Sequence, residues 1–239
     1  MITRVSVTLV DGRPRVRTVA GLLRAQAVHA RPGWVRLGLV ATTALLLGGD
    51  EVGLEIEVGA GAQLELVDVA GTVAYAGRGR PARWDTSVRL GEGARFGWRA
   101  EPFVVADGAD VTRSLTLDAA PSATAVLRET VVLGRTDETG GPLRTATTVT
   151  VGSCQVWRED QQLDPVSRAR PGLLGNARVI DSVLTLGGVE PPDRPGATRF
   201  RLPHGAGQVQ RYLGRDLAAS PLTASGTLPT RGPPEASTS

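Results

Sequence analysis

The sequence contains no lysine and a single cysteine, Cys154, among its 239 residues. One cysteine excludes an intramolecular disulfide, and a chain of this length needs none, because it can bury roughly 70–75% of its unfolded surface. Histidine is also scarce. His29, His204 and Cys154 are too few and too scattered for a tight zinc or copper site. No apolar run is long enough to cross a bilayer, and the N-terminus lacks the apolar core of a signal peptide. We therefore expect a soluble, cytoplasmic protein that does not enter a membrane.

Aromatic residues are scarce as well, at 4% of the chain. The net charge of +3 comes from arginines that are scattered among carboxylates. A nucleic-acid-binding surface would gather basic residues in one stripe and add stacking aromatics. We therefore expect no nucleic-acid partner.

What the sequence does contain is a repeated pattern of an alternating strand, a small-residue turn and a second alternating strand. The turn alanines Ala62, Ala94 and Ala123 recur about every 30 residues, a period typical of stacked supersecondary units. The three copies cover residues 55–66, 87–98 and 114–127. The apolar residues recur with period two, which predicts strands with one face inward.

Outside the repeat, Asp11-Gly12 predicts a hairpin between strands at residues 3–10 and 15–19. Residues 21–31 are compatible with a helix or a strand. The best helix candidate is residues 164–182, broken near Arg170-Pro171-Gly172, where apolar residues recur every three to four positions. Residues 213–219 are expected to form a short turn.

We predict a mainly β fold, a sandwich or a stacked-hairpin, β-helix-like scaffold with a small helical patch near the C-terminal third. One domain is expected over residues 1–219. Residues 220–239 are rich in Pro, Gly, Ser and Thr and are expected to be a disordered tail.

Catalytic signatures are missing from the sequence: there is no Walker A loop and no G-x-S-x-G elbow, so no enzyme is indicated. A paired-carboxylate hydrolase stays open because several strands carry glutamate. Most of these residues alternate with apolar ones, as on the solvated face of a sheet. They are Glu55, Glu57, Glu65, Glu101 and Glu129.

Four blocks of the sequence, in the order in which they occur, together match the pattern of a known protein family. The first has Leu-Leu-Gly-Gly-Asp at 46–50, Gly-Ala-Gly-Ala at 59–62 and a strand ending at Tyr75, and the second runs from Trp98 to Asp-Gly-Ala at 107–109. The third has Arg-Glu at 128–129 and Leu-Gly-Arg at 133–135, and the fourth has Trp-Arg-Glu at 157–159, Leu-Asp at 163–164 and Gly-Leu-Leu-Gly-Asn at 172–176. Together they resemble the urease accessory protein UreD family (also called UreH) over most of the chain.

The sequence departs from that family at a few positions. The family's His-Pro-Pro-Gly-Gly is replaced by Ala-Thr-Thr-Ala-Leu at 41–45, and its Gln and Lys fall on Val69 and Val73. Its glutamate falls on Pro102, with Glu101 displaced by one residue, which on a regular strand would point the carboxylate to the opposite face.

The resemblance implies a urease maturation chaperone that is not an enzyme and that links the urease apoprotein to UreF and, through UreF, to the GTPase UreG. It also implies that nickel passes through the scaffold, with no tightly bound cofactor and at most transient Ni²⁺. Sparse carboxylates suit such a route, because the ion must bind and leave. The candidates are Asp50, Asp68, Glu101, Asp107 and Glu129.

Glu129 ranks first among these candidates because it lies in register between Leu127 and Val131. It is therefore expected to point inward and to line a polar passage, and full exposure would contradict this. Asp50 and Asp107 adjoin glycines in expected turns, where Asp commonly bonds its own backbone. Two other functions stay open, a generic β-scaffold binding module and a carbohydrate-active β-helix enzyme.

Overall fold

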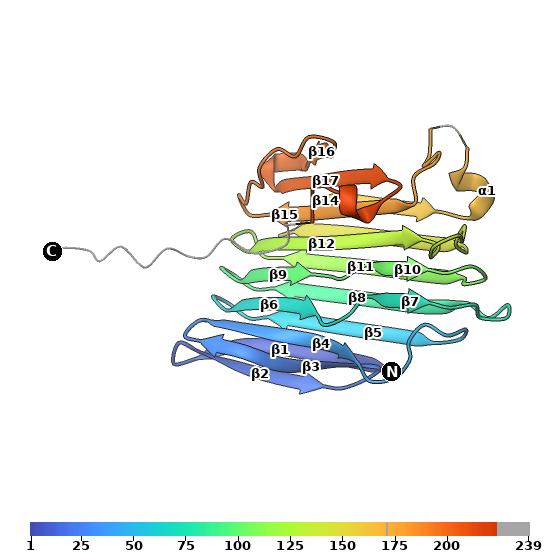
Figure 1. The fold of residues 1–239 in the computed structure, drawn as a ribbon. Coiled ribbons are helices and arrows are strands. Elements are labelled where there is room, and N and C mark those ends of the chain that lie inside the picture. The colour runs from blue at the N-terminus through green and yellow to red at the C-terminus, as the bar shows by residue number, and fades with distance from the viewer. Residues whose placement is uncertain (171, 224–239) are drawn as a thin grey trace.

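The computed structural model describes residues 1–170 and 172–223 of the chain. Two β-sheets face each other, and the chain winds between them in coils that stack from the N-terminal end to the C-terminal end (Figure 1). Sheet A has the order β14-β13-β11-β8-β5-β1-β2, and the main path of sheet B is β16-β17-β15-β12-β9-β6-β4-β3. The strands of sheet A are β1 Ile2–Val10, β2 Arg13–Val19, β5 Glu51–Val58, β8 Ala82–Leu90, β11 Val111–Ala119, β13 Leu143–Val151 and β14 Cys154–Gln162. Those of sheet B are β3 Leu23–Arg31, β4 Trp34–Ala41, β6 Gln63–Asp68, β7 Thr72–Ala74, β9 Arg95–Arg99, β10 Phe103–Val105, β12 Thr124–Leu133, β15 Val179–Leu186, β16 Thr198–Arg201 and β17 Gly207–Gly214.

The three sequence copies form successive coils of the solenoid. In each copy the first strand belongs to sheet A and the second to sheet B, and each pairs in parallel with its counterpart in the next copy. The turn alanines are buried and stacked, because the N–H of Arg95 donates to the carbonyl of Ala62 and that of Thr124 to Ala94, both at 2.9 Å. The β-helix-like prediction is confirmed. Within each copy the two strands do not pair with each other as in a hairpin, since they lie in different sheets.

The N-terminal end of the stack consists of two antiparallel pairs, β1 with β2 and β3 with β4. Asp11 and Gly12 both have positive φ, +49° and +71°, as the predicted tight hairpin turn requires. Residues 23–31 form a strand, which decides between the two structures that the sequence left open.

The predicted helix over 164–182 is wrong for most of its length. Helix α1 covers only Pro165–Arg168, capped by the Asp164 carboxylate, and strand β15 begins at Val179. Gly172 and Gly175 both have positive φ, so the backbone between these elements turns repeatedly and cannot continue a helix. From Val179 onward the β-branched residues pair with β12, and this tertiary pairing overrides the helical spacing.

The C-terminal elements are two short 3₁₀ turns, η1 Pro203–Gly205 and η2 Leu217–Ala219. β17 continues to Gly214, so the short turn expected over 213–219 forms only in its second half. Ser220 and Leu222 are buried at 4% and 0% exposure, so the packed chain extends beyond the boundary expected at residue 219. The rest of the expected tail, residues 224–239, lies outside the described residues.

The core fills the space between the two sheets, where the alternating apolar side chains of both meet. Phe96, Leu64, Leu54 and Leu117 are fully buried there. Among the described helices, none combines the length and the apolar character that a membrane span needs.

Candidate interior polar passage

A polar row crosses the inner face of sheet B. Strand register aligns the apolar side chains of Leu66, Trp98, Leu127, Leu184 and Val209 across five strands. Because inward side chains alternate along a strand, the next inward row lies two residues away in each strand, later in the chain for the other strands and earlier for the antiparallel β15. That row, called here the inner polar row, consists of Asp68, Glu129, Ser182 and Arg211, with Ala100 between the first two. It runs across the strands and therefore along the direction in which the coils stack.

Glu129 lies at the middle of the inner polar row. Its neighbours Leu127 and Val131 are buried, and its own side chain is 40% exposed. Two adjoining hollows of about 40 and 50 Å³ meet at Glu129, each with room for a few water molecules. Glu129 thus points inward as its register predicts; its part in a metal route stays a prediction.

Glu129 is paired with Arg113, which points inward from β11 of the opposite sheet. The distance between Arg113 Nη2 and Glu129 Oε1 is 2.8 Å. The guanidinium lies over the ring of Phe103, 4.2 Å from its centroid, and 5.8 Å from that of Trp84. The most prominent carboxylate of the interior is therefore neutralised by a cation from across the core.

Glu159 and Arg211 form a second pair further along the same space. Arg211 donates from Nη1 and Nη2 to the two carboxylate oxygens of Glu159, at 2.5 and 2.7 Å. Its Nε donates to Ser182 Oγ at 3.0 Å. Glu159 comes from β14 of sheet A, so this pair also bridges the two sheets.

Asp68 lies at the other end of the inner polar row. It is held by two N–H donors, whereas Glu129 and Glu159 each contact an arginine. Burial raises the pKa of Asp68 to about 6, against the lowering effects of a hydrogen bond from Trp98 Nε1, one from the Glu101 backbone N–H and the charge of Arg113. The two hydrogen bonds measure 3.0 and 3.2 Å. With this pKa the folded chain keeps a share of Asp68 protonated at pH values where an ordinary aspartate is fully ionised.

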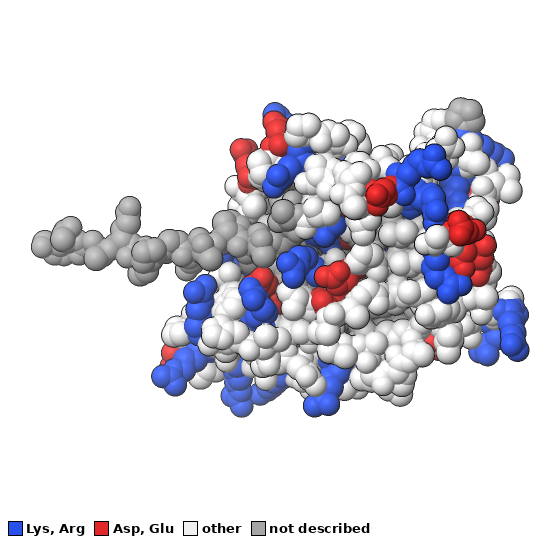
Figure 2. All heavy atoms as spheres, in the orientation of Figure 1, with Lys and Arg blue, Asp and Glu red and all other residues white. Residues whose placement is uncertain are grey.

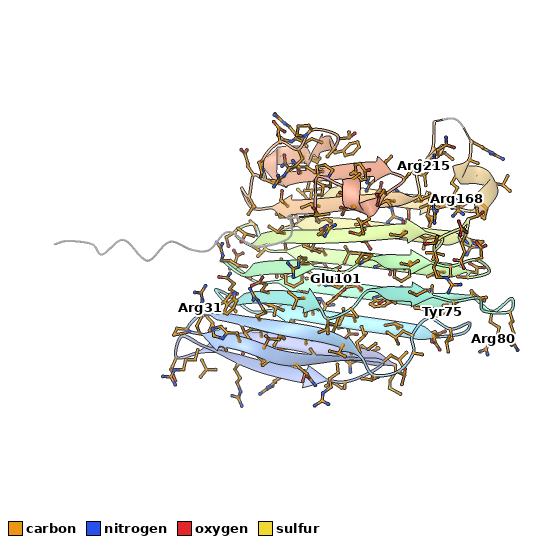
Figure 3. All side chains as sticks on the ribbon, in the orientation of Figure 1. Arg31, Tyr75, Arg80, Glu101, Arg168 and Arg215 are labelled. Atoms are coloured by element: carbon orange, nitrogen blue, oxygen red, sulfur yellow. The ribbon has the colours of Figure 1, made fainter. Side chains whose placement is uncertain are left out.

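Glu101 lies in the irregular segment between β9 and β10, so the alternation rule for a regular strand does not apply to it. Its backbone N–H contacts Asp68, and its negative charge contributes to the raised pKa of that residue. Figure 3 shows Glu101 on the face of sheet B where β9 ends, and Figure 2 shows acidic side chains at that place. The one-residue displacement from Pro102 therefore leaves Glu101 close to Asp68.

Asp50 and Asp107 lie in turns and do not join the row. Asp50 Oδ2 accepts from the N–H of Leu47 at 3.0 Å, and Asp107 Oδ1 accepts from the N–H of Gly140 at 2.6 Å. The first contact is local and closes the turn around Asp50. The second joins the turn of Asp107 to a distant loop at Gly140. The structure therefore places Asp68 and Glu129 in the inner polar row, with the backbone N–H of Glu101 bonded to Asp68, and leaves Asp50 and Asp107 outside that row.

Sequence reasoning missed Arg113, Ser182, Glu159 and Arg211. Arg113 had a usable signal, since it alternates with Val111 and Leu115 in a strand whose other inward positions are apolar. The same signal singled out Glu129. The other three lie in strands whose inward face could be assigned only from their pairing partners.

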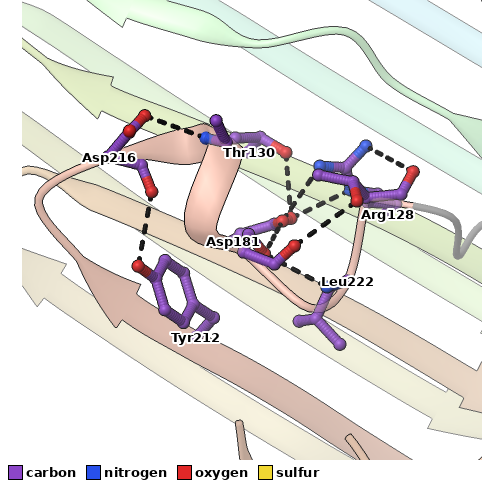
Figure 4. A network of polar contacts seen from close by, with 9 residues as sticks. Arg128, Thr130, Asp181, Tyr212, Asp216 and Leu222 are labelled. Carbon is purple, nitrogen blue, oxygen red and sulfur yellow. Dashed lines mark hydrogen bonds and ion pairs between the residues drawn. The ribbon is translucent and has the colours of Figure 1, made fainter. Parts of the chain in front are cut away.

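A second polar cluster, on the outer face of sheet B, is shown in Figure 4. Asp181 is fully buried and accepts from Arg128 at 3.0 and 2.9 Å, from Thr130 Oγ1 at 2.9 Å and from Ser220 Oγ at 2.6 Å. Leu222 packs beside it against Val126 and Val183. This group, called here the Asp181 cluster, fastens the C-terminal segment to the sheet.

The arginines are less evenly scattered than their overall count indicates. No Asp or Glu occurs between Asp11 and Asp50, so the β1–β4 end carries arginine without neighbouring carboxylates in its own sequence. Figure 2 shows basic side chains gathered along that lower edge. The prediction of an even mixture is wrong for this part of the surface.

The outer face of sheet A has a larger hollow of about 550 Å³. Its carboxylates include Glu55, paired with Arg4 at 2.7 Å, and Asp85, paired with Arg83 at 2.5 Å. Glycoside hydrolysis needs one carboxyl group held protonated as an acid. Asp85 does not fit that role, because its pKa is lowered: burial raises it, but the hydrogen bonds from Arg83 and Ser114 outweigh burial.

Over the described part of the chain, no three His, Cys, Asp or Glu side chains gather closely enough to hold a metal ion. The fold and the interior thus define a β-solenoid scaffold whose interior contains a few charged side chains, those of the inner polar row and their partners.

Comparison with known proteins agrees with this class. The model of the UreD urease accessory protein family matches residues 9–222. Urease accessory protein UreD 1 of Streptomyces griseus is 41% identical over 74% of this chain and 69% of its own length. The UreD proteins of Frankia casuarinae and Streptomyces avermitilis are 33% and 29% identical over 91% and 90% of this chain, and over 71% and 82% of their own lengths. The chain belongs to the UreD family of urease accessory proteins.

Proposed function

We propose that this protein is a scaffold for urease maturation that acts through assembly and metal transfer, without catalysing a reaction itself. It would hold the urease apoprotein and UreF, and through UreF the GTPase UreG. Family membership supports the role in urease maturation. The closed β-solenoid supports a scaffold, because its stacked coils give a long rigid body with two distant ends.

The metal cargo would be Ni²⁺, moving along the inner polar row. The observation that carries this proposal is the inward Glu129, in register with Ser182 and Arg211 on the inner face of sheet B. A charged side chain in such a place must be paired, solvated or functional. Single carboxylates that are not gathered into one ligand cluster bind a hard or intermediate cation weakly, as transfer requires.

The experiment is co-expression of the full chain with the urease apoprotein, UreF and UreG, with two separate readouts. Affinity capture measures complex formation, and metal analysis of the purified urease measures delivered nickel. We expect the wild-type chain to capture both partners. We expect the double variant Asp68→Asn with Glu129→Gln to capture them equally while delivering several-fold less nickel.

Glu55→Gln is the matched control, because it removes an exposed carboxylate from the outer face of sheet A. It should change neither readout. If neither partner co-purifies and urease activates normally without this chain, the scaffold proposal is wrong. If the double variant delivers nickel at the wild-type level, the route along the inner polar row is wrong although the scaffold role stands.

A further inference from the structure

Arg113 places a positive charge at the middle of a route proposed for a cation. Its side chain is only 14% exposed, and its Nη2 contacts Glu129 at 2.8 Å. A guanidinium fixed there would repel a divalent ion at Glu129, although solvent at this 40% exposed side chain screens part of the repulsion. It would also occupy the carboxylate that the ion needs. Arg113 Nη2 contacts Oε1 of Glu129, so a cation that bound this carboxylate would compete with Arg113 for it.

Arg113 has fewer hydrogen-bond acceptors than its donor groups could use. Within the described residues its Nε and Nη1 are buried without a hydrogen-bond partner. Unsatisfied buried donors are unfavourable, so the arrangement around Glu129 is not fully optimised for the pair. The guanidinium also lies 4.2 Å from the Phe103 ring centroid, and this contact does not depend on Glu129. The Phe103 face therefore offers the guanidinium a favourable contact when it leaves the carboxylate.

Arg211, in the same interior space, is an arginine whose side-chain nitrogens all have hydrogen-bond acceptors. It makes a two-point contact with Glu159, at 2.5 and 2.7 Å, and its Nε donates to Ser182. Each of its three nitrogens has an acceptor. Arg113 has one carboxylate contact and two unpartnered nitrogens. The difference between the two pairs marks Arg113–Glu129 as the one that can exchange.

We infer that Arg113 is a displaceable internal counter-ion: it neutralises Glu129 when no metal is bound and leaves the carboxylate when a divalent cation arrives. This inference rests on the proposed nickel route and adds its regulation. Competition from Arg113 keeps the cation weakly bound at Glu129. Removal of Arg113 should therefore tighten metal binding and slow its release.

The test is equilibrium binding of Ni²⁺ alone to the purified full chain. Arg113→Gln should bind Ni²⁺ at least about tenfold more tightly than the wild type, because a competing positive charge is gone. The gain should vanish in the double variant Arg113→Gln with Glu129→Gln. Arg36→Gln is the matched control, since it removes an arginine from an Arg–Glu pair on the outer face, where Arg36 contacts Glu65 at 2.9 Å, and it should bind as the wild type does.

A second measurement follows the Arg113 side chain itself in the wild-type chain. In a chain labelled with ¹⁵N-arginine, Zn²⁺ serves as a diamagnetic probe of the same charge. The Nε–Hε signal of Arg113, assigned by its loss in Arg113→Lys, should shift during the titration while that of Arg36 stays in place.

Two outcomes overturn the inference. One is a folded Arg113→Gln variant that binds Ni²⁺ no more tightly than the wild type, and the other is an Arg113 signal that Zn²⁺ leaves unmoved. Failure of the nickel route looks different. In that case Arg113→Gln still gains affinity through Glu129, but the nickel content of co-expressed urease does not respond to Asp68→Asn with Glu129→Gln.

Discussion

Asp68 and Asp181 are two aspartates of the same sheet that face opposite sides and have opposite surroundings. Asp181, on the outer face, is fully buried and accepts from the guanidinium of Arg128 and from two hydroxyl groups. Asp68, on the inner face, has two N–H donors and a raised pKa of about 6. The first carboxylate is saturated with donors and serves structure. The second accepts only two hydrogen bonds, and its burial is only partly compensated.

Removing the Asp181 carboxylate should have the largest effect on stability. Asp181→Ala leaves Arg128 buried beside Thr130 and Ser220 without a counter-charge, and breaking a buried pair in this way costs about 3–5 kcal/mol. Urea unfolding should show the midpoint falling with little change in slope. The control is the double variant Arg128→Met with Asp181→Leu, which removes both charges and should recover much of the loss. A loss below about 1 kcal/mol in Asp181→Ala would contradict the structural role of the cluster.

Asp68→Asn should act in the opposite direction and stabilise the fold near neutral pH. Burial raises the pKa of Asp68 from 3.8 to about 6, so between these values the folded chain holds a proton that the unfolded chain has released. Stability therefore falls as pH rises through this window and is lowest above it. Asparagine avoids that cost of ionisation, which amounts to roughly 3 kcal/mol above pH 7.

The pH dependence separates this effect from a change in packing. Below about pH 4 Asp68 is protonated in both states, so the advantage of Asp68→Asn should disappear there. Unfolding at pH 4 and pH 8 gives the comparison, with Asp181→Asn as a control that should destabilise at pH 8. An equal stabilisation by Asp68→Asn at both pH values would show that the burial of its charge is not the cause.

The sequence predicted the stacked coils well because the pattern that encodes them is local. Turn alanines and period-two alternation appear within each copy, and Glu129 stands out as a polar residue at an apolar position. The helix expected over 164–182 failed because β15 is formed by pairing with β12 and β17, which local spacing does not show.

Partners of the polar groups were the least predictable part of the candidate site. Arg113 meets Glu129 from the other sheet, and Ser220 reaches Asp181 from a segment whose composition predicts disorder. Glu101 depends on an irregular segment whose course no alternation rule gives. Such contacts are set by how the coils stack and by where the C-terminal segment returns, and both are tertiary features.

Ser220→Ala should have a smaller effect than Asp181→Ala, because Arg128 and Thr130 still satisfy the carboxylate. The hydroxyl of Ser220 donates to Asp181 at 2.6 Å and accepts from the N–H of Leu222 at 3.2 Å. Loss of a hydrogen bond to a charged group costs about 1.5–3 kcal/mol. Thr223→Ala is the control, since its hydroxyl makes only a 3.4 Å contact, and urea unfolding should barely register it. Equal losses in the two variants would mean that the segment is held by packing rather than by Asp181.

The smallest effect is expected at an exposed pair, which calibrates the comparison between the two aspartates. Glu55 contacts Arg4 at 2.7 Å, as short as the contacts of Asp181, but their side chains are 47% and 54% exposed. Water and salt screen such a pair, so Glu55→Gln should cost between 0 and about 1 kcal/mol, and less in high salt. Urea unfolding at low and high salt tests this directly. A loss of several kcal/mol would show that contact distance, and not burial, sets the value of a carboxylate in this fold, and the contrast between Asp68 and Asp181 would then lose its basis.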